Sequence, residues 1–204
     1  MDEQRRAHIL KVAEQLLRHY GPQKTTIAEI ARAADVGVGT VYLEFDSKEA
    51  IVEELSAVHH QAVLDAMRQA LEGERPFGDR LRAMFDARLA AFLRLDAEGN
   101  HARDLVHCVS PAVRSAHARF KQAELELVEE LLGHGDDAAE FACGSRQCGD
   151  LASAVLMAYA SFGPPFVFGM DKDELTRKQS AMHHLVLYGL LRRDLPAASR
   201  PRKR

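Results

Sequence analysis

Apolar residues recur every three to four positions along most of the chain, and no segment shows the alternation typical of a β-strand. The first such stretch covers residues 2–20. It is followed by Gly21-Pro22, a glycine and a proline in the order that commonly ends a helix. The pattern therefore predicts an all-α protein that begins with a long helix.

Residues 25–48 contain two much shorter helical patterns joined by a turn. Thr26 is a suitable N-cap, and Glu29 follows three residues later, which completes a capping box. The helical spacing breaks at residues 35–37 and resumes over residues 38–45. Because two helices of this length bury little core, the arrangement favours a helix-turn-helix, in which the first helix supports a second that enters a DNA major groove.

Capping residues and apolar stripes predict further helices in the rest of the chain. Ser47 and Ser110 are suitable N-caps, and Asp171 with Glu174 forms a second capping box. The glycines and cysteines of residues 133–149 predict a loop. The predicted helices cover residues 47–73, 76–99, 101–108, 110–132, 150–162 and 171–193. With the first three, they give an expectation of about nine helices.

The composition restricts the class of protein further. No apolar run among the 204 residues is long enough to span a bilayer, and the charged N-terminus lacks the apolar segment of a signal peptide. Three cysteines are an odd number without a disulfide framework, which favours a reducing compartment. We therefore expect a cytoplasmic protein with no membrane partner.

Net charge does not by itself support nucleic-acid binding. The formal charge is −3, and residues 1–50 contain seven Lys or Arg against eight Asp or Glu. Phosphate contacts also come from hydroxyls, backbone N–H groups and helix N-termini, so a balanced charge does not exclude a DNA-binding head.

Residues 7–55 resemble the TetR family of bacterial transcriptional regulators. The resemblance rests on Ile9-Leu10, Ala13, Leu16-Leu17, Gly21, Thr25-Thr26, Ile30-Ala31, Ala34, Val36-Gly37, Gly39-Thr40-Val41-Tyr42, Phe45 and Ser47-Lys48-Glu49. Asp35 departs from the glycine that the family usually has there. Since aspartate tolerates a left-handed backbone better than most residues, we expect the turn to be retained.

The resemblance implies a homodimer that binds a pseudopalindromic operator and responds to a small, hydrophobic effector, most often as a repressor that the effector releases. It implies a helix-turn-helix head over residues 1–46 and an effector-binding and dimerisation body over 47–195. The basic residues at the end of the chain predict a disordered tail over 196–204. The implied DNA-contacting residues are Thr26, Val38, Gly39, Thr40, Tyr42, Leu43 and Lys48. No cofactor is expected.

Two of these residues, and Glu44 beside them, carry specific expectations. Leu43 is placed to contact a thymine methyl group. Lys48 lies in the first turn of a helix, where a cation is unfavourable, which indicates an external phosphate. Glu44, which follows Leu43, either accepts a hydrogen bond from a cytosine amine or points to solvent.

In the body, two features of the pattern are interpretable. Residues 182–191 are apolar nearly all round, and the helix over 150–162 carries small side chains, so together they predict a four-helix dimer interface. Candidate effector-binding residues are Phe85, Leu89, Phe92, His107 and Phe120, with ordinary core packing as the alternative for each.

Two other classes of function stay open. A redox- or metal-responsive regulator would use Cys108, Cys143 or Cys148. The adjacent pairs His59-His60 and His183-His184 are poor chelators, because neighbours on a helix diverge by about 100°. We therefore expect no metal site. A helical enzyme or carrier is the more remote alternative, and the sequence shows no nucleophile elbow, phosphate loop or other catalytic motif.

Overall fold

The computed structural model describes residues 3–97, 101–106, 110–143 and 148–191. Within these ranges the chain forms eight α-helices and two short 3₁₀ helices, and its only strand-like contact is an isolated bridge between Phe141 and Leu191. The elements are α1 (Glu3–Tyr20), α2 (Ile27–Ala33), α3 (Val38–Glu44), α4 (Lys48–Gln69), α5 (Phe77–Ala97), η1 (Ala102–Leu105), α6 (Pro111–Asp137), α7 (Cys148–Ala158), η2 (Ala160–Phe162) and α8 (Lys172–Leu190). The all-α prediction is confirmed, with eight helices in place of about nine.

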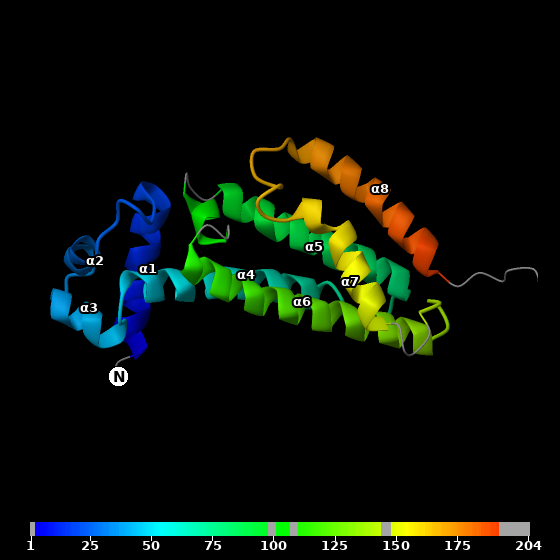
Figure 1. Ribbon diagram of the computed structural model, residues 1–204, viewed down its shortest axis with the longest axis horizontal. Helices are drawn as coiled ribbons and strands as arrows, with labels where there is room; N and C mark the ends of the chain where they lie inside the picture. Colours follow the sequence, from blue (N-terminus) through cyan, green and yellow to red (C-terminus); the bar gives the residue numbers. More distant parts are fainter. Residues whose placement is uncertain (1–2, 98–100, 107–109, 144–147, 192–204) are drawn as a thin grey trace, which may run out of the picture.

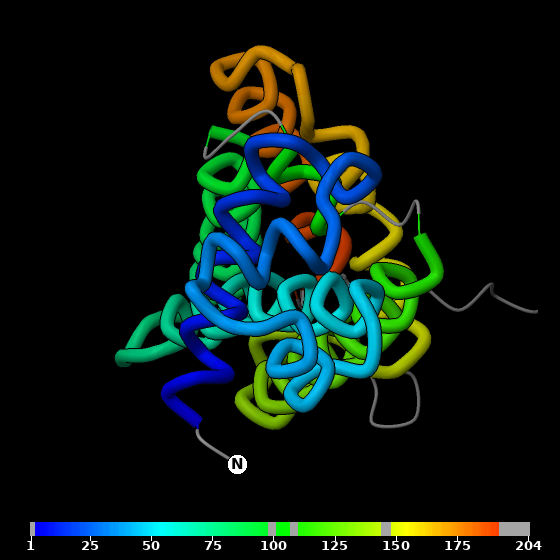
Figure 2. The backbone as a smooth tube through the Cα atoms, turned by 90° about the vertical axis from the view of Figure 1, so that its left-hand side faces the viewer, coloured from blue at the N-terminus to red at the C-terminus, as the bar shows by residue number. Residues whose placement is uncertain are grey.

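The molecule is elongated, with a small head at one end and a larger helical body at the other (Figure 1). Helices α1, α2 and α3 form the head, and α2 and α3 lie at its outer tip, facing the viewer in Figure 2. Helix α4 runs from the head into the body, where it packs against α5 and α6. Helix α7 packs on α6, and α8 covers α5 and α7.

Helix α6 is longer than the sequence predicted. It continues through Gly133 and Gly135 to Asp137, inside the segment expected to be a loop. The ring of Phe141 occupies the space beside Gly135, where an added Cβ would lie 2.3 Å from the ring. Gly135 is therefore required by close packing rather than by a helix end, and a single sequence does not distinguish these two roles of glycine.

Other helix boundaries also differ from the prediction. The helix predicted over residues 101–108 is the 3₁₀ helix η1, and residues 107–109 lie outside the described ranges. The helix predicted over 150–162 divides into α7 and η2. At α8 only half of the expected capping box forms. Asp171 accepts from the backbone N–H of Glu174 at 2.8 Å, whereas the Glu174 carboxylate pairs with Lys178.

A buried ion pair connects three helices of the body. The Arg88 guanidinium of α5 donates to the Glu124 carboxylate of α6, and both side chains are almost fully buried. Arg88 also donates to the backbone carbonyl of Phe162 at 3.1 Å, just after α7. Lys121 satisfies the second carboxylate oxygen of Glu124 at 2.7 Å. This side-chain cluster therefore fixes the relative positions of α5, α6 and the end of α7.

We predict that Arg88→Met lowers the free energy of unfolding by about 3–5 kcal/mol, because it leaves Glu124 charged in a dry core with Lys121 as its remaining cation. Urea unfolding followed by circular dichroism measures this loss. Arg119→Met is the matched control, since Arg119 pairs with Glu53 at the exposed surface. Its loss should be much smaller, and equal losses in the two variants would contradict the assignment.

Candidate nucleic-acid interface and ligand pockets

The head has its own hydrophobic core, which extends across the predicted domain boundary at residues 46 and 47. Helices α1, α2 and α3 contribute Ile9, Ala13, Leu17, Ile30, Ala31, Ala34, Val41 and Phe45. Ile51, Val52 and Leu55 of α4 and three residues of the body, Leu105, Ala112 and Val113, complete the cluster. The first turns of α4 are therefore packed as part of the head.

The turn between α2 and α3 forms as the sequence predicts. Thr26 accepts from the backbone N–H of Glu29, and the Glu29 carboxylate accepts from the backbone N–H of Thr26, so the capping box is complete. Asp35 has a φ of 54°, the left-handed conformation that the family's usual glycine adopts without strain. The turn is therefore retained, and α2 and α3 pack against each other.

Helix α3 exposes large apolar side chains on its outer face. Val38, Tyr42 and Leu43 are 45%, 52% and 77% exposed, whereas Val41 is fully buried on the opposite face. The N-cap of α3 is Gly37, which adds no side-chain cap to the helix N-terminus. A Cβ at Gly39 would meet no atom within 4 Å. The first turn of α3 is therefore open to the approach of another molecule.

The structure contradicts both interpretations of Glu44. Its side chain is 1% exposed and accepts from Nε of Arg5 at 2.8 Å, so it neither points to solvent nor reaches a base. Arg6 donates to the backbone carbonyl of Glu44 and to Glu54, and its guanidinium stacks on the Phe45 ring at 4.0 Å. Arg5 and Arg6 therefore connect the start of α1 to the end of α3. Sequence spacing alone could not reveal a pair 39 residues apart.

Lys48 makes two contacts inside the head. Its ammonium donates to the backbone carbonyls of Pro22 at 2.7 Å and Thr25 at 3.1 Å. It therefore connects the start of α4 to the loop before α2, next to the exposed Thr26. An ammonium has three N–H donors, so a phosphate contact by Lys48 stays a prediction alongside this structural role.

The candidate effector residues lie mainly in the core of the body. Phe85 stacks on Tyr159 with ring centroids 3.7 Å apart, and Phe120 packs between Phe92 and His60. Leu89 lines a cavity between α5 and α8. His107 lies outside the described residues. Core packing is thus the observed environment of the three phenylalanines.

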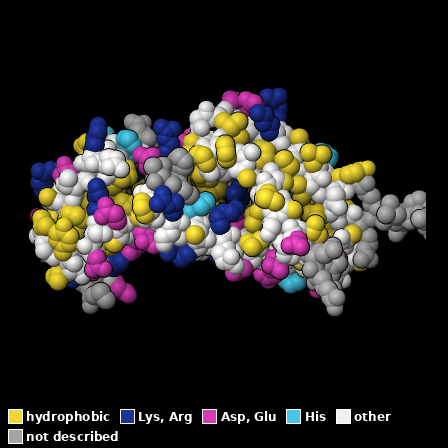
Figure 3. All heavy atoms as spheres, viewed as in Figure 1, with side chains coloured by type: hydrophobic (Ala, Val, Ile, Leu, Met, Phe, Trp, Pro, Cys, Tyr) yellow, Lys and Arg dark blue, Asp and Glu magenta, His cyan; other side chains and the backbone are white. Residues whose placement is uncertain are grey.

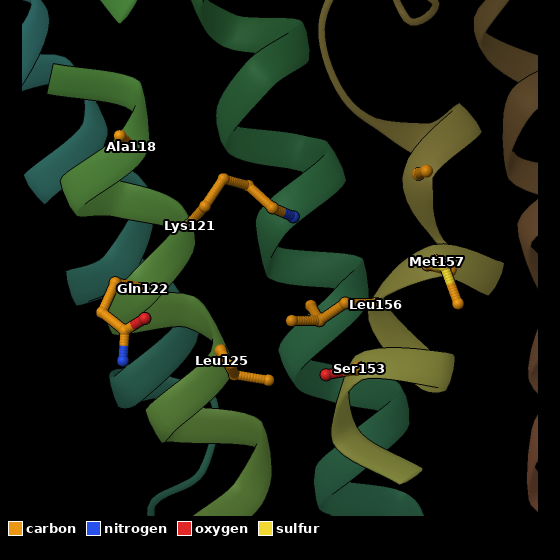
Figure 4. A pocket seen from close by; sticks show the side chains of 8 residues that line it. Ala118, Lys121, Gln122, Leu125, Ser153, Leu156 and Met157 are labelled. Carbon is orange, nitrogen blue, oxygen red and sulfur yellow. The ribbon is translucent and has the colours of Figure 1, made fainter. Parts of the chain in front are cut away.

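A groove of about 570 Å³ lies between α6 and α7. Figure 4 shows Leu125 of α6 and Leu156 of α7 pointing toward each other, with the Lys121 side chain extending across the upper part of the groove. Most of the lining is apolar, and Lys121 is already paired with Glu124. The groove therefore offers an apolar surface for a small molecule, which residue spacing in α6 and α7 did not identify.

Histidines cluster where the head meets the body. His59 of α4 lies 3.1 Å from the Glu14 carboxylate of α1, and this contact holds the pKa of Glu14 below its usual range. His60 faces away from this contact, toward Ser56 and His117. Burial, with nearby His117 as a second cause, lowers the pKa of His60 to about 4. The adjacent histidines therefore diverge as expected, and the described residues contain no cluster of three or more metal-binding side chains.

Two cysteines of the redox alternative are described, and Cys108 is not. Cys143 and Cys148 carry free thiols, and burial raises the pKa of Cys143 to about 11. A thiol with a raised pKa is a poor nucleophile at neutral pH, because the thiolate is the reactive form.

Comparison with known proteins assigns the head. Residues 9–55 match the family described as bacterial regulatory proteins, tetR family. The uncharacterized HTH-type transcriptional regulator YhgD of Bacillus subtilis (strain 168) is 30% identical over 86 residues, 42% of this chain and 45% of YhgD. The probable HTH-type transcriptional regulator ArpR of Pseudomonas putida is 32% identical over 107 residues, 52% of this chain and 50% of ArpR. The matched region thus spans about half the length of these relatives.

The fold of the whole chain has a counterpart among solved structures. NalD, the secondary repressor of the MexAB-OprM multidrug efflux pump in Pseudomonas aeruginosa, superimposes with a TM-score of 0.61 at 22% identity, over 95% of this chain and 98% of NalD. The head therefore resembles those of DNA-binding transcriptional regulators of the helix-turn-helix class. Within that class, residues 9–55 match the TetR family of bacterial regulatory proteins.

We predict that the protein loses stability as the pH falls from 6.5 to 4. His60 is buried neutral, with a folded pKa near 4, whereas in the unfolded chain it takes up a proton near pH 6.5. Its contribution is fully present above pH 6.5 and is lost through this window, by up to roughly 3 kcal/mol. Urea unfolding at pH 7 and pH 4.5 measures the effect.

His60→Gln should flatten this pH dependence, because glutamine does not titrate. His184→Gln is the matched control, since His184 is exposed on α8. A pH dependence that is unchanged in His60→Gln, or equally flattened in both variants, would contradict the role of burial at His60.

Proposed function

We propose that this protein is a dimeric, ligand-responsive transcriptional repressor that binds a pseudopalindromic operator through α3. The observation that carries the proposal is the exposed apolar face of α3, formed by Val38, Tyr42 and Leu43. Soluble proteins rarely expose large apolar residues together unless the surface binds a partner. In this helix-turn-helix the face matches the side that enters a major groove, with Gly39 and Thr40 at the approaching end.

The charges of the head are compatible with DNA binding, although residues 1–50 contain one more acidic than basic residue. The carboxylates of three glutamates already have partners. Glu44 accepts from Arg5, and Glu14 lies 3.1 Å from His59. Glu29 accepts from the Thr26 backbone N–H. Lys24 and Arg32, in contrast, are exposed on the head. Hydroxyls of Thr26, Thr40 and Tyr42 supply further phosphate contacts in the proposal.

Dimerisation is proposed through α7 and α8. On α8, Leu185 and Tyr188 are 70% and 71% exposed, while Leu187 and Leu190 pack inward on the body. On α7, Met157 is also exposed. Figure 3 shows hydrophobic side chains gathered over this part of the body and again at the tip of the head. Two copies that joined these faces would form the four-helix interface expected from the sequence.

The effector is proposed to be a small hydrophobic molecule that binds the body. Support comes from the apolar groove between α6 and α7 and from the cavity between α5 and α8. The fold shared with NalD, which is a repressor, favours repression. A thiol-based redox input is less well supported, because the Cys143 thiol is held protonated by its raised pKa. Among the described residues no helix is long and apolar enough to span a membrane.

We predict that Tyr42→Ala weakens operator binding roughly tenfold to a hundredfold, the range for one lost hydrogen bond to a charged group. Stability should change little, because Tyr42 is exposed. The measurement is a mobility-shift titration at fixed salt on genomic fragments, beginning with DNA upstream of the protein's own gene.

Tyr20→Ala is the matched control for this experiment. Tyr20 lies on the head with the same 52% exposure as Tyr42, but at the end of α1 and away from α3. The proposal is overturned if the wild-type protein shifts no genomic fragment, or if the two variants bind identically.

We also predict that the double variant Leu185→Lys, Tyr188→Lys is monomeric at micromolar concentration. Dimerisation would force both ammonium groups out of water, which is costly without a partner. Light scattering after gel filtration measures the mass, and operator affinity should fall in parallel. Val58→Lys, at an equally apolar but separate exposed site on α4, should stay dimeric. A dimeric double variant would exclude this interface.

A further inference from the structure

A cavity of about 710 Å³ lies between α5 and the N-terminal half of α8. Its apolar wall includes Leu89 and Leu93 of α5 and Met170, which precedes α8. Asp86 and Gln179 lie on its polar side. The exposed apolar residues proposed for dimerisation belong to the C-terminal half of α8, so the cavity and the dimer interface occupy different parts of the helix.

Hydrogen bonds on the polar side have a defined direction. The Asp86 carboxylate accepts only, so His183 donates to it from Nε2 at 3.0 Å. The Tyr159 hydroxyl lies 2.6 Å from Nδ1, the other ring nitrogen of His183. Burial raises the pKa of Tyr159, which keeps this hydroxyl protonated. Tyr159 and His183 are therefore connected in series to the Asp86 carboxylate.

Gln179 has one side-chain atom that these hydrogen bonds leave without a partner. Its Nε2 donates to Asp86 Oδ1 at 2.7 Å, which fixes the orientation of the amide. The Gln179 side-chain oxygen Oε1 is buried and has no hydrogen-bond partner, and the residue is 1% exposed. A buried acceptor without a donor is costly, so the cavity wall is suited to a molecule that brings an N–H group.

Asp86 offers a second acceptor at the same wall. Its side chain is 57% exposed, although one oxygen already accepts from His183 and Gln179. Asp96, Arg94 and Lys172 also line the cavity, and with Asp86 their formal charges cancel. Selection by bulk charge is therefore weak, and unsatisfied acceptors determine which ligand fits.

We propose that this cavity binds an amphipathic organic amine, with its ammonium group donating to Asp86 and Gln179 and its apolar part against Leu89, Leu93 and Met170. This inference deepens the proposed function, on which its role as the effector site rests. The ammonium supplies the donor that Gln179 Oε1 lacks and neutralises the Asp86 carboxylate. The three apolar side chains bury the hydrocarbon part of the ligand.

Three probes with the same apolar body test the ligand class: 4-phenylbutylamine, 4-phenylbutanol and 5-phenylpentanoate. Titration calorimetry on the full chain, without DNA, measures each affinity. We expect one amine per chain, bound at least roughly tenfold more tightly than the alcohol or the carboxylate, because only the ammonium makes charge-assisted hydrogen bonds to both acceptors. Equal affinities, or tightest binding of the carboxylate, would overturn the proposal.

Two variants locate the site. Asp86→Asn and Gln179→Met should each weaken amine binding roughly tenfold or more. Gln69→Met, the same change at an exposed residue at the end of α4, should leave it unaltered. Circular dichroism checks that each variant is folded, and Asp86→Asn keeps the test decisive if Gln179→Met is not. Wild-type affinity in folded Asp86→Asn would exclude this cavity.

Failure of this inference is distinguishable from failure of the proposed function. Calorimetry needs no operator, so amine binding stands or falls without regard to DNA binding. Conversely, if the wild-type protein shifts no DNA, or if Tyr42→Ala and Tyr20→Ala bind identically, the regulator proposal is overturned whatever the calorimetry shows. In the wild type, release of operator by 4-phenylbutylamine and not by the alcohol is the expected result for an effector site, and its absence would overturn the effector role.

Discussion

The structure depends most on one constraint, the continuity of α4 through two hydrophobic cores. The first turns of this helix pack with α1, α2 and α3 through Ile51 and Leu55, and its later turns pack with α5 and α6 through Val63 and Met67. An uninterrupted helix transmits rotation or translation between its ends, because bending it would break backbone hydrogen bonds. The position of the head is therefore coupled to the packing of the body.

Sequence patterns identified the parts of the head that local chemistry determines. The Thr26–Glu29 cap and the left-handed turn at Asp35 depend on residues within a few positions of each other, and both are present. Glu44 could not be interpreted in this way, because its partner Arg5 is distant in sequence. Gly135 was misinterpreted for a similar reason, since the Phe141 ring that requires a glycine there is a tertiary contact.

The body was less predictable because its chemistry lies in contacts between helices. Apolar spacing identified Phe85, Phe92 and Phe120 as inward-facing, but spacing does not separate a core residue from a cavity wall. The polar cavity-lining residues Asp86 and Gln179 carry no sequence motif, and become notable only when α8 places them together against α5. The sequence did predict that α8 carries apolar residues on two faces, because a helix that is apolar nearly all round needs a partner on each face.

A ligand between α5 and α8 has a contiguous route to the head. Helix α5 packs on α4 and on η1, and η1 in turn contacts α1. His101, at the start of η1, donates its backbone N–H to the Arg18 carbonyl near the end of α1, and its ring would lie 3.0 Å from a Cβ at Gly21. Leu105 of η1 belongs to the head core. A shift of α5 would therefore act on the head at both α4 and α1. In the proposed dimer, such a shift would change the spacing between the two heads, on which binding to a pseudopalindromic operator would depend.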